Sequence, residues 1–184
     1  AFRRRGLTPV HELNWWDSCL HAGQRFTFVP AQHWSRRTPW DTNRSHWGGW
    51  VVSPDRSDDP DCSSAEQASE ARSKWPVLYY AGDSGYFAGF QEIGRRFPID
   101  YALLPIGAYE PEWFMRMQHV SPEEAVQAFE DLGAAKFVPM HYGAFRLADD
   151  TPKEALDRLM AEWKRRRLVP ERLCLLKIGE TLRA

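Results

Sequence analysis

The chain has 184 residues, of which 43% are hydrophobic and 27% are charged, and its formal net charge is −1. This length fits a single domain, 1–184, that buries a sizeable core, and the composition excludes a disordered or collagen-like chain. No apolar stretch approaches the roughly 20 residues that span a bilayer. The near-neutral charge argues against a nucleic-acid binder. Three well-separated cysteines form no CxxC pair, which favours a reducing, cytoplasmic compartment.

The first third of the chain predicts two strands followed by an insertion. Residues 26–29 (FTFV) end at a proline, and residues 47–52 are apolar with a Gly-Gly pair that suggests a bulge or a close backbone approach. Residues 53–74 are polar, contain two prolines and have no apolar period. We expect this segment to be a mobile surface insertion between two strands, because it has too little apolar area to offset the entropy of ordering it.

The remainder of the chain alternates strands and helices, which indicates an α/β fold. The predicted strands are 77–81, 101–104, 135–140 and 173–178, and a short helix is predicted at 86–97. The next helix has the clearest signals, because Ser121 and Glu124 form a capping box around Pro122, and Gly133 stops the helical period. Thr151 opens a last helix in the same way, with an arginine run in its final turn.

Three polar residues stand just beyond predicted strands, at the ends where α/β sheets bind ligands. They are His33, Asp83 and His141. Two imidazoles and a carboxylate suit zinc or a similar divalent ion. Each residue also has an ordinary explanation: a surface histidine, a helix cap and a histidine packed at a strand end. Spacing alone leaves both interpretations open, because no two of the three share a short motif.

A fourth candidate, His119, stands directly before the capped helix. A histidine beside a helix N-terminus can meet an anion held there by the free N–H groups. Simple packing of His119 on its loop is the competing interpretation.

Several segments in order along the chain resemble one family. They are 10–17 (VHELNWWD), 30–37 (PAQHWSRR), 81–86 (AGDSGY), 104–111 (LPIGAYEP), 118–120 (QHV), 122–125 (PEEA) and 141–143 (HYG). The family is that of the metallo-β-lactamase-fold hydrolases. Within it, the chain is similar to the branch of N-acyl-phosphatidylethanolamine-hydrolysing phospholipase D and its bacterial relatives. The resemblance runs from about residue 10 to about residue 180, interrupted only by the 53–74 segment.

The resemblance implies an αββα sandwich with two zinc ions between its sheets. His33 would be a ligand of the first zinc, Asp83 would bridge both ions, and His141 would be a late ligand of the second. Gln118 and His119 match a pair beside the metals that contacts substrate.

One family feature is absent. The H-x-H-x-D-H motif, which supplies four ligands, precedes the region matched here, and the remaining histidines, His11, His21 and His46, are isolated. The chain therefore resembles mainly the C-terminal half of such an enzyme. We expect an incomplete site and a sheet with one apolar face uncovered, which favours self-association, for instance as a homodimer.

The resemblance implies zinc-assisted hydrolysis of N-acyl-phosphatidylethanolamine-type phospholipids to phosphatidic acid and an N-acylethanolamine. Asp83 would act at the metals, and His119 would donate a hydrogen bond or proton to the phosphoryl or leaving oxygen. A phospholipid substrate implies peripheral contact with a membrane. Two alternatives remain open: a metallo-hydrolase of a small lactone or phosphodiester, and a catalytically incomplete fragment.

Overall fold

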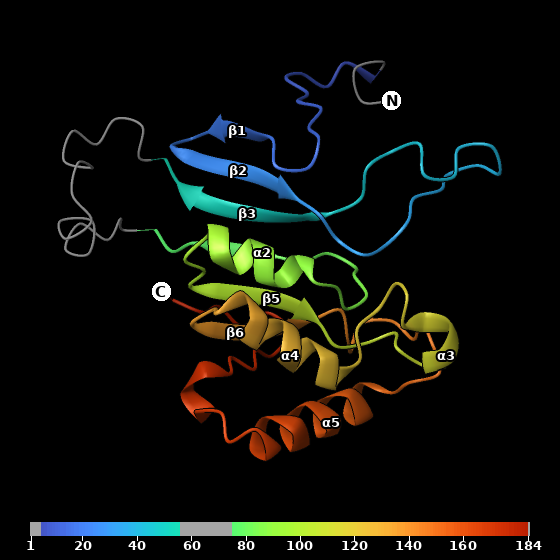
Figure 1. Ribbon diagram of the computed structural model, residues 1–184, viewed down its shortest axis with the longest axis vertical. Helices are drawn as coiled ribbons and strands as arrows, with labels where there is room; N and C mark the ends of the chain where they lie inside the picture. The colour runs from blue at the N-terminus through green and yellow to red at the C-terminus, as the bar shows by residue number, and fades with distance from the viewer. Residues whose placement is uncertain (1–4, 56–74, 184) are drawn as a thin grey trace.

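The computed structural model describes residues 5–55 and 75–183 of the chain. Its strands form one six-stranded sheet in chain order (Figure 1). The strands are β1 (Ser18–His21), β2 (Gln24–Val29), β3 (Gly49–Pro54), β4 (Leu78–Tyr80), β5 (Tyr101–Pro105) and β6 (Lys136–Met140). Pairing is antiparallel from β1 to β4 and parallel from β4 to β6. Strands β2, β4, β5 and β6 therefore all run in one direction and end at the same edge of the sheet.

The helices gather on one face of this sheet (Figure 1). They are α2 (Gly89–Arg96), the single turn α3 (Glu112–Met115), α4 (Pro122–Leu132) and α5 (Pro152–Arg165), followed by a 3₁₀ turn at Pro170–Arg172. Helix α4 contacts β5 and lies between α2 and α5. This mixed α/β arrangement confirms the predicted fold class.

Helix α4 has the predicted ends. The Ser121 hydroxyl accepts the Glu124 amide at 3.2 Å, and the Glu124 carboxylate accepts the Ser121 amide at 3.1 Å. Gly133 ends the helix with φ 61°, a left-handed conformation that glycine adopts at little cost. These local signals fix where α4 starts, and the site described below lies just before that start.

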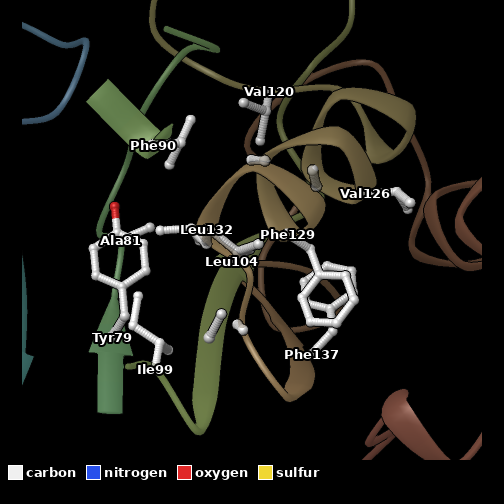
Figure 2. Packing of buried hydrophobic residues seen from close by; sticks show 14 of the residues in the cluster. Tyr79, Ala81, Phe90, Ile99, Leu104, Val120, Val126, Phe129, Leu132 and Phe137 are labelled. Atoms are coloured by element: carbon white, nitrogen blue, oxygen red, sulfur yellow. The ribbon is translucent and has the colours of Figure 1, made fainter. Parts of the chain in front are cut away.

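The core fills the space between the sheet and the helices (Figure 2). Strand side chains alternate between faces, and one row pairs Val51, Tyr79, Ala102 and Phe137, all of them fully buried. The helices contribute buried partners to the same cluster: Phe90, Ile93, Ala125, Val126, Phe129, Leu132, Leu159 and Trp163. This continuous apolar layer holds the parallel strands in register.

The opposite face of the sheet is apolar but only partly buried. Its rows include Val52, Leu78, Leu103 and Val138. They line a groove of 730 Å³ together with residues from the chain end and from the turn before β4, among them Trp75 and Leu182. An uncovered apolar face was expected from the sequence, and the described residues leave one here.

Three details differ from the sequence prediction. The segment 173–178 is not a strand, because only Leu173 bridges to β6, and Ile178 at its end is 95% exposed. The helix predicted from residue 86 begins only at Gly89, because Gly85 is held in a bridge to Gln32. Strand β1 and the turn α3 were not anticipated.

The predicted 53–74 insertion also starts too early, because Ser53 and Pro54 belong to β3. The remainder of it, from residue 56 on, lies outside the described residues. Within the described ranges, no helix combines the length and the apolar character that crossing a membrane requires.

Replacing Gly94 with alanine tests the contact between α2 and α4. A methyl group at this position would lie 2.5 Å from the Leu132 carbonyl oxygen, so the helices must separate. We expect Gly94→Ala to lower the free energy of unfolding by about 1–3 kcal/mol, measured by urea denaturation. Alanine is otherwise the better helix former by about 1 kcal/mol. A gain in stability would therefore contradict the close contact.

Candidate metal centre

Three strands deliver polar residues that follow them to one edge of the sheet. Asp83 lies three residues beyond β4, and His141 directly follows β6. His33 lies four residues beyond β2, which runs in the same direction. Because the strand ends are aligned, residues that are far apart in sequence meet at this edge. Of the predicted set, Asp83 lies close to both of the others: to His33 within the cluster that also contains His119, and to His141 through a direct contact.

The side chains lie within the range of a shared ion. One donor atom each from His33, Asp83 and His119 lies within 4.8 Å of the others. The Nε2 atom of His141 lies 3.2 Å from Oδ1 of Asp83. The His119 ring stands between the other two imidazoles, with ring centroids 5.6 Å from His33 and 5.6 Å from His141. Asp83 is thus surrounded by three imidazoles.

The hydrogen bonds of the histidines leave ring nitrogens free for a ligand. His33 Nδ1 lies 2.8 Å from the Trp34 carbonyl oxygen, which can only accept, so Nδ1 carries a proton and Nε2 is the nitrogen that offers a lone pair in the neutral ring. The Nδ1 atoms of His119 and His141 are buried and have no hydrogen-bond partner among the described residues. Burial lowers the pKa of the His119 imidazole, although the nearby Asp83 carboxylate acts in the opposite direction. A neutral imidazole is the form that binds a metal.

These observations fit a divalent cation. Three imidazoles and one carboxylate are a set of ligands that zinc binds. A bound ion or substrate would also supply the partner that the buried ring nitrogens lack. The Asp83 side chain is 44% exposed, so the cluster is open to solvent on one side. The site can therefore both hold an ion and admit a substrate.

A serine and a glycine after Asp83 bring the other two segments inward. The buried Ser84 hydroxyl accepts the Gln32 amide at 3.0 Å, and the Ser84 carbonyl accepts the Val120 amide at 2.9 Å. Gly85 donates its amide to the Gln32 carbonyl at 2.8 Å. A Cβ on Gly85 would lie 2.7 Å from the Arg116 carbonyl oxygen. Only glycine allows the backbones that carry His33 and His119 to approach this closely.

The loop after β5 is fixed from the opposite side by Asp150. Its carboxylate accepts backbone amides from Ala108, Tyr109 and Glu110 at 3.0–3.3 Å. Ala108 has φ 63°, an uncommon conformation for a residue with a side chain, and these bonds help to hold it. The loop lies beside His141, because a cavity lined by Gly107 and Ala108 also contacts His141.

The sequence assigned His119 to substrate contact beside the metals. In the structure a ring nitrogen of His119 also lies within 4.8 Å of donor atoms of His33 and Asp83, a position compatible with either role. Gln118 lies next to it at the end of the α3 turn, where its amide donates to the Met115 carbonyl. Ser84, Gly85 and Asp150 were missed. The turn-forming sequence Gly-Asp-Ser-Gly at 82–85 is the one local signal that pointed to such a junction.

An α/β sheet with histidines and an aspartate at its strand ends is an arrangement that can hold a metal ion. Residues 1–142 match the family model described as the beta-lactamase superfamily domain. Because this match covers most of the chain, the chain belongs to the beta-lactamase superfamily.

Two relatives of known name are similar to the chain in sequence. The mitochondrial N-acyl-phosphatidylethanolamine-hydrolyzing phospholipase D of Saccharomyces cerevisiae is 32% identical over 168 residues, which cover 86% of this chain and 32% of the relative. The N-acyl-phosphatidylethanolamine-hydrolyzing phospholipase D 1 of Caenorhabditis elegans is 33% identical over 165 residues, covering 84% of this chain and 41% of the relative. The chain thus spans about a third to two fifths of the length of these relatives.

A solved structure shares the fold. Igni18, a metallo hydrolase from the archaeon Ignicoccus hospitalis, superimposes with a TM-score of 0.64 and 22% sequence identity. The match covers 98% of this chain and 63% of Igni18.

Replacing Gly85 with alanine tests whether this close backbone contact assembles the centre. The added methyl group must push the Arg116–Met117 backbone away, so we expect zinc affinity, measured by isothermal titration calorimetry, to fall about tenfold or more. Gly23→Ala is the matched control, because Gly23 has φ 74° but open space around its Cα, far from the centre. Equal zinc affinities in the two variants would contradict the assembly role of Gly85.

Proposed function

We propose that the chain carries the late ligands of a zinc-dependent phosphodiester hydrolase that acts on N-acyl-phosphatidylethanolamine-type phospholipids. The observation that carries this proposal is the meeting of three imidazoles around Asp83, in a chain whose relatives in yeast and in Caenorhabditis elegans bear that activity in their names. The roles proposed are metal ligation by His33, Asp83 and His141, and substrate contact by Gln118 and His119.

The chemistry divides between the ion and the chain. When bound, zinc supplies a Lewis acid for phosphoryl oxygens and a source of hydroxide at neutral pH. Asp83 supplies the negative charge that would hold the cation. Because its side chain is partly exposed, the site is open to solvent on that side. Burial lowers the pKa of His119, which favours its neutral imidazole. The N–H of its neutral ring can donate a hydrogen bond to a phosphoryl or leaving oxygen. The other ring nitrogen keeps a lone pair that could bind the metal.

Exposed aromatic residues next to the centre support a lipid substrate. In α3, Trp113 is 80% exposed and Phe114 is 60% exposed, and the turn leads directly to Gln118 and His119. Tryptophan favours the interface between lipid and water. We propose peripheral contact with a membrane through this turn.

A small polar substrate is the competing proposal, and one observation favours it. A cavity of 120 Å³ beside His119 is lined by Tyr109, Glu112, Arg116 and Ser121. It is large enough for a phosphate-sized group but not for an acyl chain. A small lactone or phosphodiester would fit this cavity alone, whereas a phospholipid would place only its headgroup there.

Zinc titration of the 184-residue chain tests the metal proposal. Donor atoms of His33, Asp83 and His119 lie within 4.8 Å of one another, and His141 contacts Asp83, so we expect a single bound zinc rather than the two of a complete family site. His119→Ala should lower the affinity about tenfold or more if its ring is a ligand, and should leave it unchanged if the ring contacts only substrate. His46→Ala is the control, because His46 packs against Trp15. Absence of zinc binding by the unaltered chain would overturn the metal proposal.

Hydrolysis assays test the substrate. The four donors described here fall short of a two-ion site, so we expect no steady turnover by the 184-residue chain alone. The chain extended upstream in its own reading frame should release phosphatidic acid from N-acyl-phosphatidylethanolamine vesicles, followed by mass spectrometry. Asp83→Asn in the extended chain should reduce this activity by about a thousandfold or more, since one carboxylate serves the metal site. Turnover of small lactones without turnover of the phospholipid would favour the competing proposal.

A further inference from the structure

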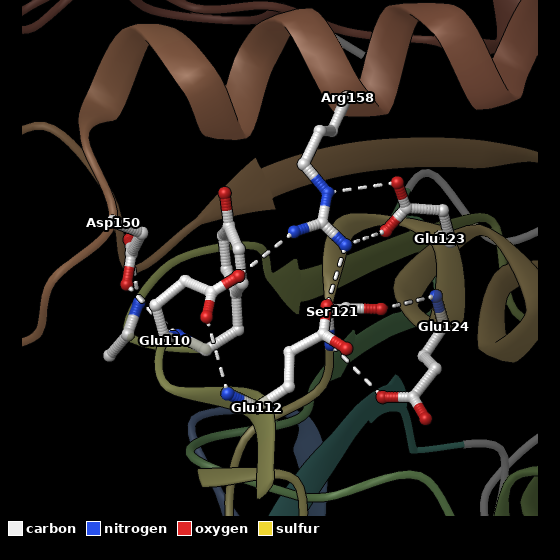
Figure 3. Close-up of polar contacts among 9 residues, drawn as sticks. Glu110, Glu112, Ser121, Glu123, Glu124, Asp150 and Arg158 are labelled. Carbon is white, nitrogen blue, oxygen red and sulfur yellow. Dashed lines mark hydrogen bonds and ion pairs between the residues drawn. The ribbon is translucent and has the colours of Figure 1, made fainter.

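A single arginine on α5 contacts four residues around the start of α4 (Figure 3). Arg158 donates to both carboxylate oxygens of Glu123, at 2.9 and 2.7 Å. It also donates to Glu112 at 2.8 Å and lies 3.5 Å from a carboxylate oxygen of Glu110. Its guanidinium carbon lies 4.5 Å from the centre of the Tyr109 ring. The planar fork of arginine allows this number of contacts, which a lysine could not reproduce.

The partners of Arg158 lie at both ends of the segment that carries Gln118 and His119. We call residues 112–123 the histidine segment. Glu112 is its first residue and Glu123 its last, so Arg158 holds the two ends against one point on α5. Glu110, just before the segment, is held by the same guanidinium. Arg158 therefore links the two ends directly.

The first half of the histidine segment has few packing contacts, because the α3 turn has four residues and buries none of them. Its last part is anchored by the buried residues Val120 and Ser121 at the start of α4. On the other side, the segment is tied to the candidate centre by the amide of Val120, which donates to Ser84, and by the Gln32 side chain, which donates to the Met117 carbonyl at 3.3 Å. Arg158 thus supplies the opposing anchor to the contacts that reach the centre.

Loss of Arg158 would leave three neighbouring carboxylates without their shared cation. Three carboxylates face one guanidinium whose side chain is only 27% exposed. Without the cation, Glu110, Glu112 and Glu123 would repel one another in a partly desolvated place, and the turn α3 is free to move outward. The displaced residues would include the ring of His119.

We propose that Arg158 is a positioning residue that sets the place of Gln118 and His119 at the candidate centre by holding both ends of the histidine segment. This inference rests on the proposed function for its importance to catalysis, but not for its structural content.

Arg166, the residue that directly follows α5, provides a control. It also links α5 to α4, through Gln127 and Glu130, and its side chain is 20% exposed. Its contacts lie at the far end of α4 from the histidine segment, so Arg166→Gln removes a comparable ionic link without touching the candidate centre.

The test compares Arg158→Gln with Arg166→Gln in the full 184-residue chain. Thermal unfolding reports stability, two-dimensional ¹H–¹⁵N spectra report the His119 ring, and calorimetric titration reports zinc affinity. We expect both variants to lose a similar amount of stability. Only Arg158→Gln should shift the His119 ring signals and weaken zinc binding about tenfold. Equal effects of the two variants on the ring signals would overturn the proposal.

Two further variants keep the result decisive. If Arg158→Gln does not fold, Glu112→Gln removes only the anchor at the start of the histidine segment, and its carboxylate is 52% exposed. Movement of the His119 signals in that variant supports the proposal, and unchanged signals overturn it. Arg158→Lys keeps the charge but not the fork, so we expect it to restore stability without restoring the ring position. The ring signals are read without zinc or substrate, so a failure of the proposed function would leave this test intact.

Discussion

The parallel alignment of β4, β5 and β6 is the constraint on which the candidate centre depends. Two antiparallel steps separate β2 from β4, so β2 runs in the same direction as these three strands. The buried row on the helical face holds the strands in register, because slipping by one residue would turn those side chains to the uncovered face. Register in the core therefore decides which residues emerge at the edge, and those residues include Asp83 and His141.

Alignment of strands brings backbones to one edge but does not by itself place side chains within the reach of one ion. The final approach depends on local contacts at Ser84 and Gly85, which join the segment after β2 to the segment before α4. Arg158 acts from the other side of that segment. The position of His119 thus depends on contacts from the strand ends on one side and from α5 on the other. Such a position is sensitive to changes well away from the metal ligands themselves.

The sequence predicted those parts of the site that follow from strand ends. An apolar run comes shortly before each of His33, Asp83 and His141, and this pattern can be recognised from one sequence alone. The ligand-like position of His119 could not be predicted in this way, because it follows a turn whose path is set by contacts with Ser84 and Arg158. Similarly, the capping box of α4 is a local signal and was predicted. The strand predicted at 173–178 depends instead on pairing with β6, and only Leu173 makes such a pair.

The number of donors limits what this part of the fold can do. A catalytic zinc uses three protein ligands and keeps one position open, whereas a two-ion centre must hold both ions a few ångströms apart. The described residues contain one cluster that could hold an ion, formed by His33, Asp83 and His119, and His141 adds a fourth donor beside the carboxylate. Asp83 is the one carboxylate among these four, so two cations would share a single negative charge. A two-ion mechanism therefore requires donors beyond these four residues.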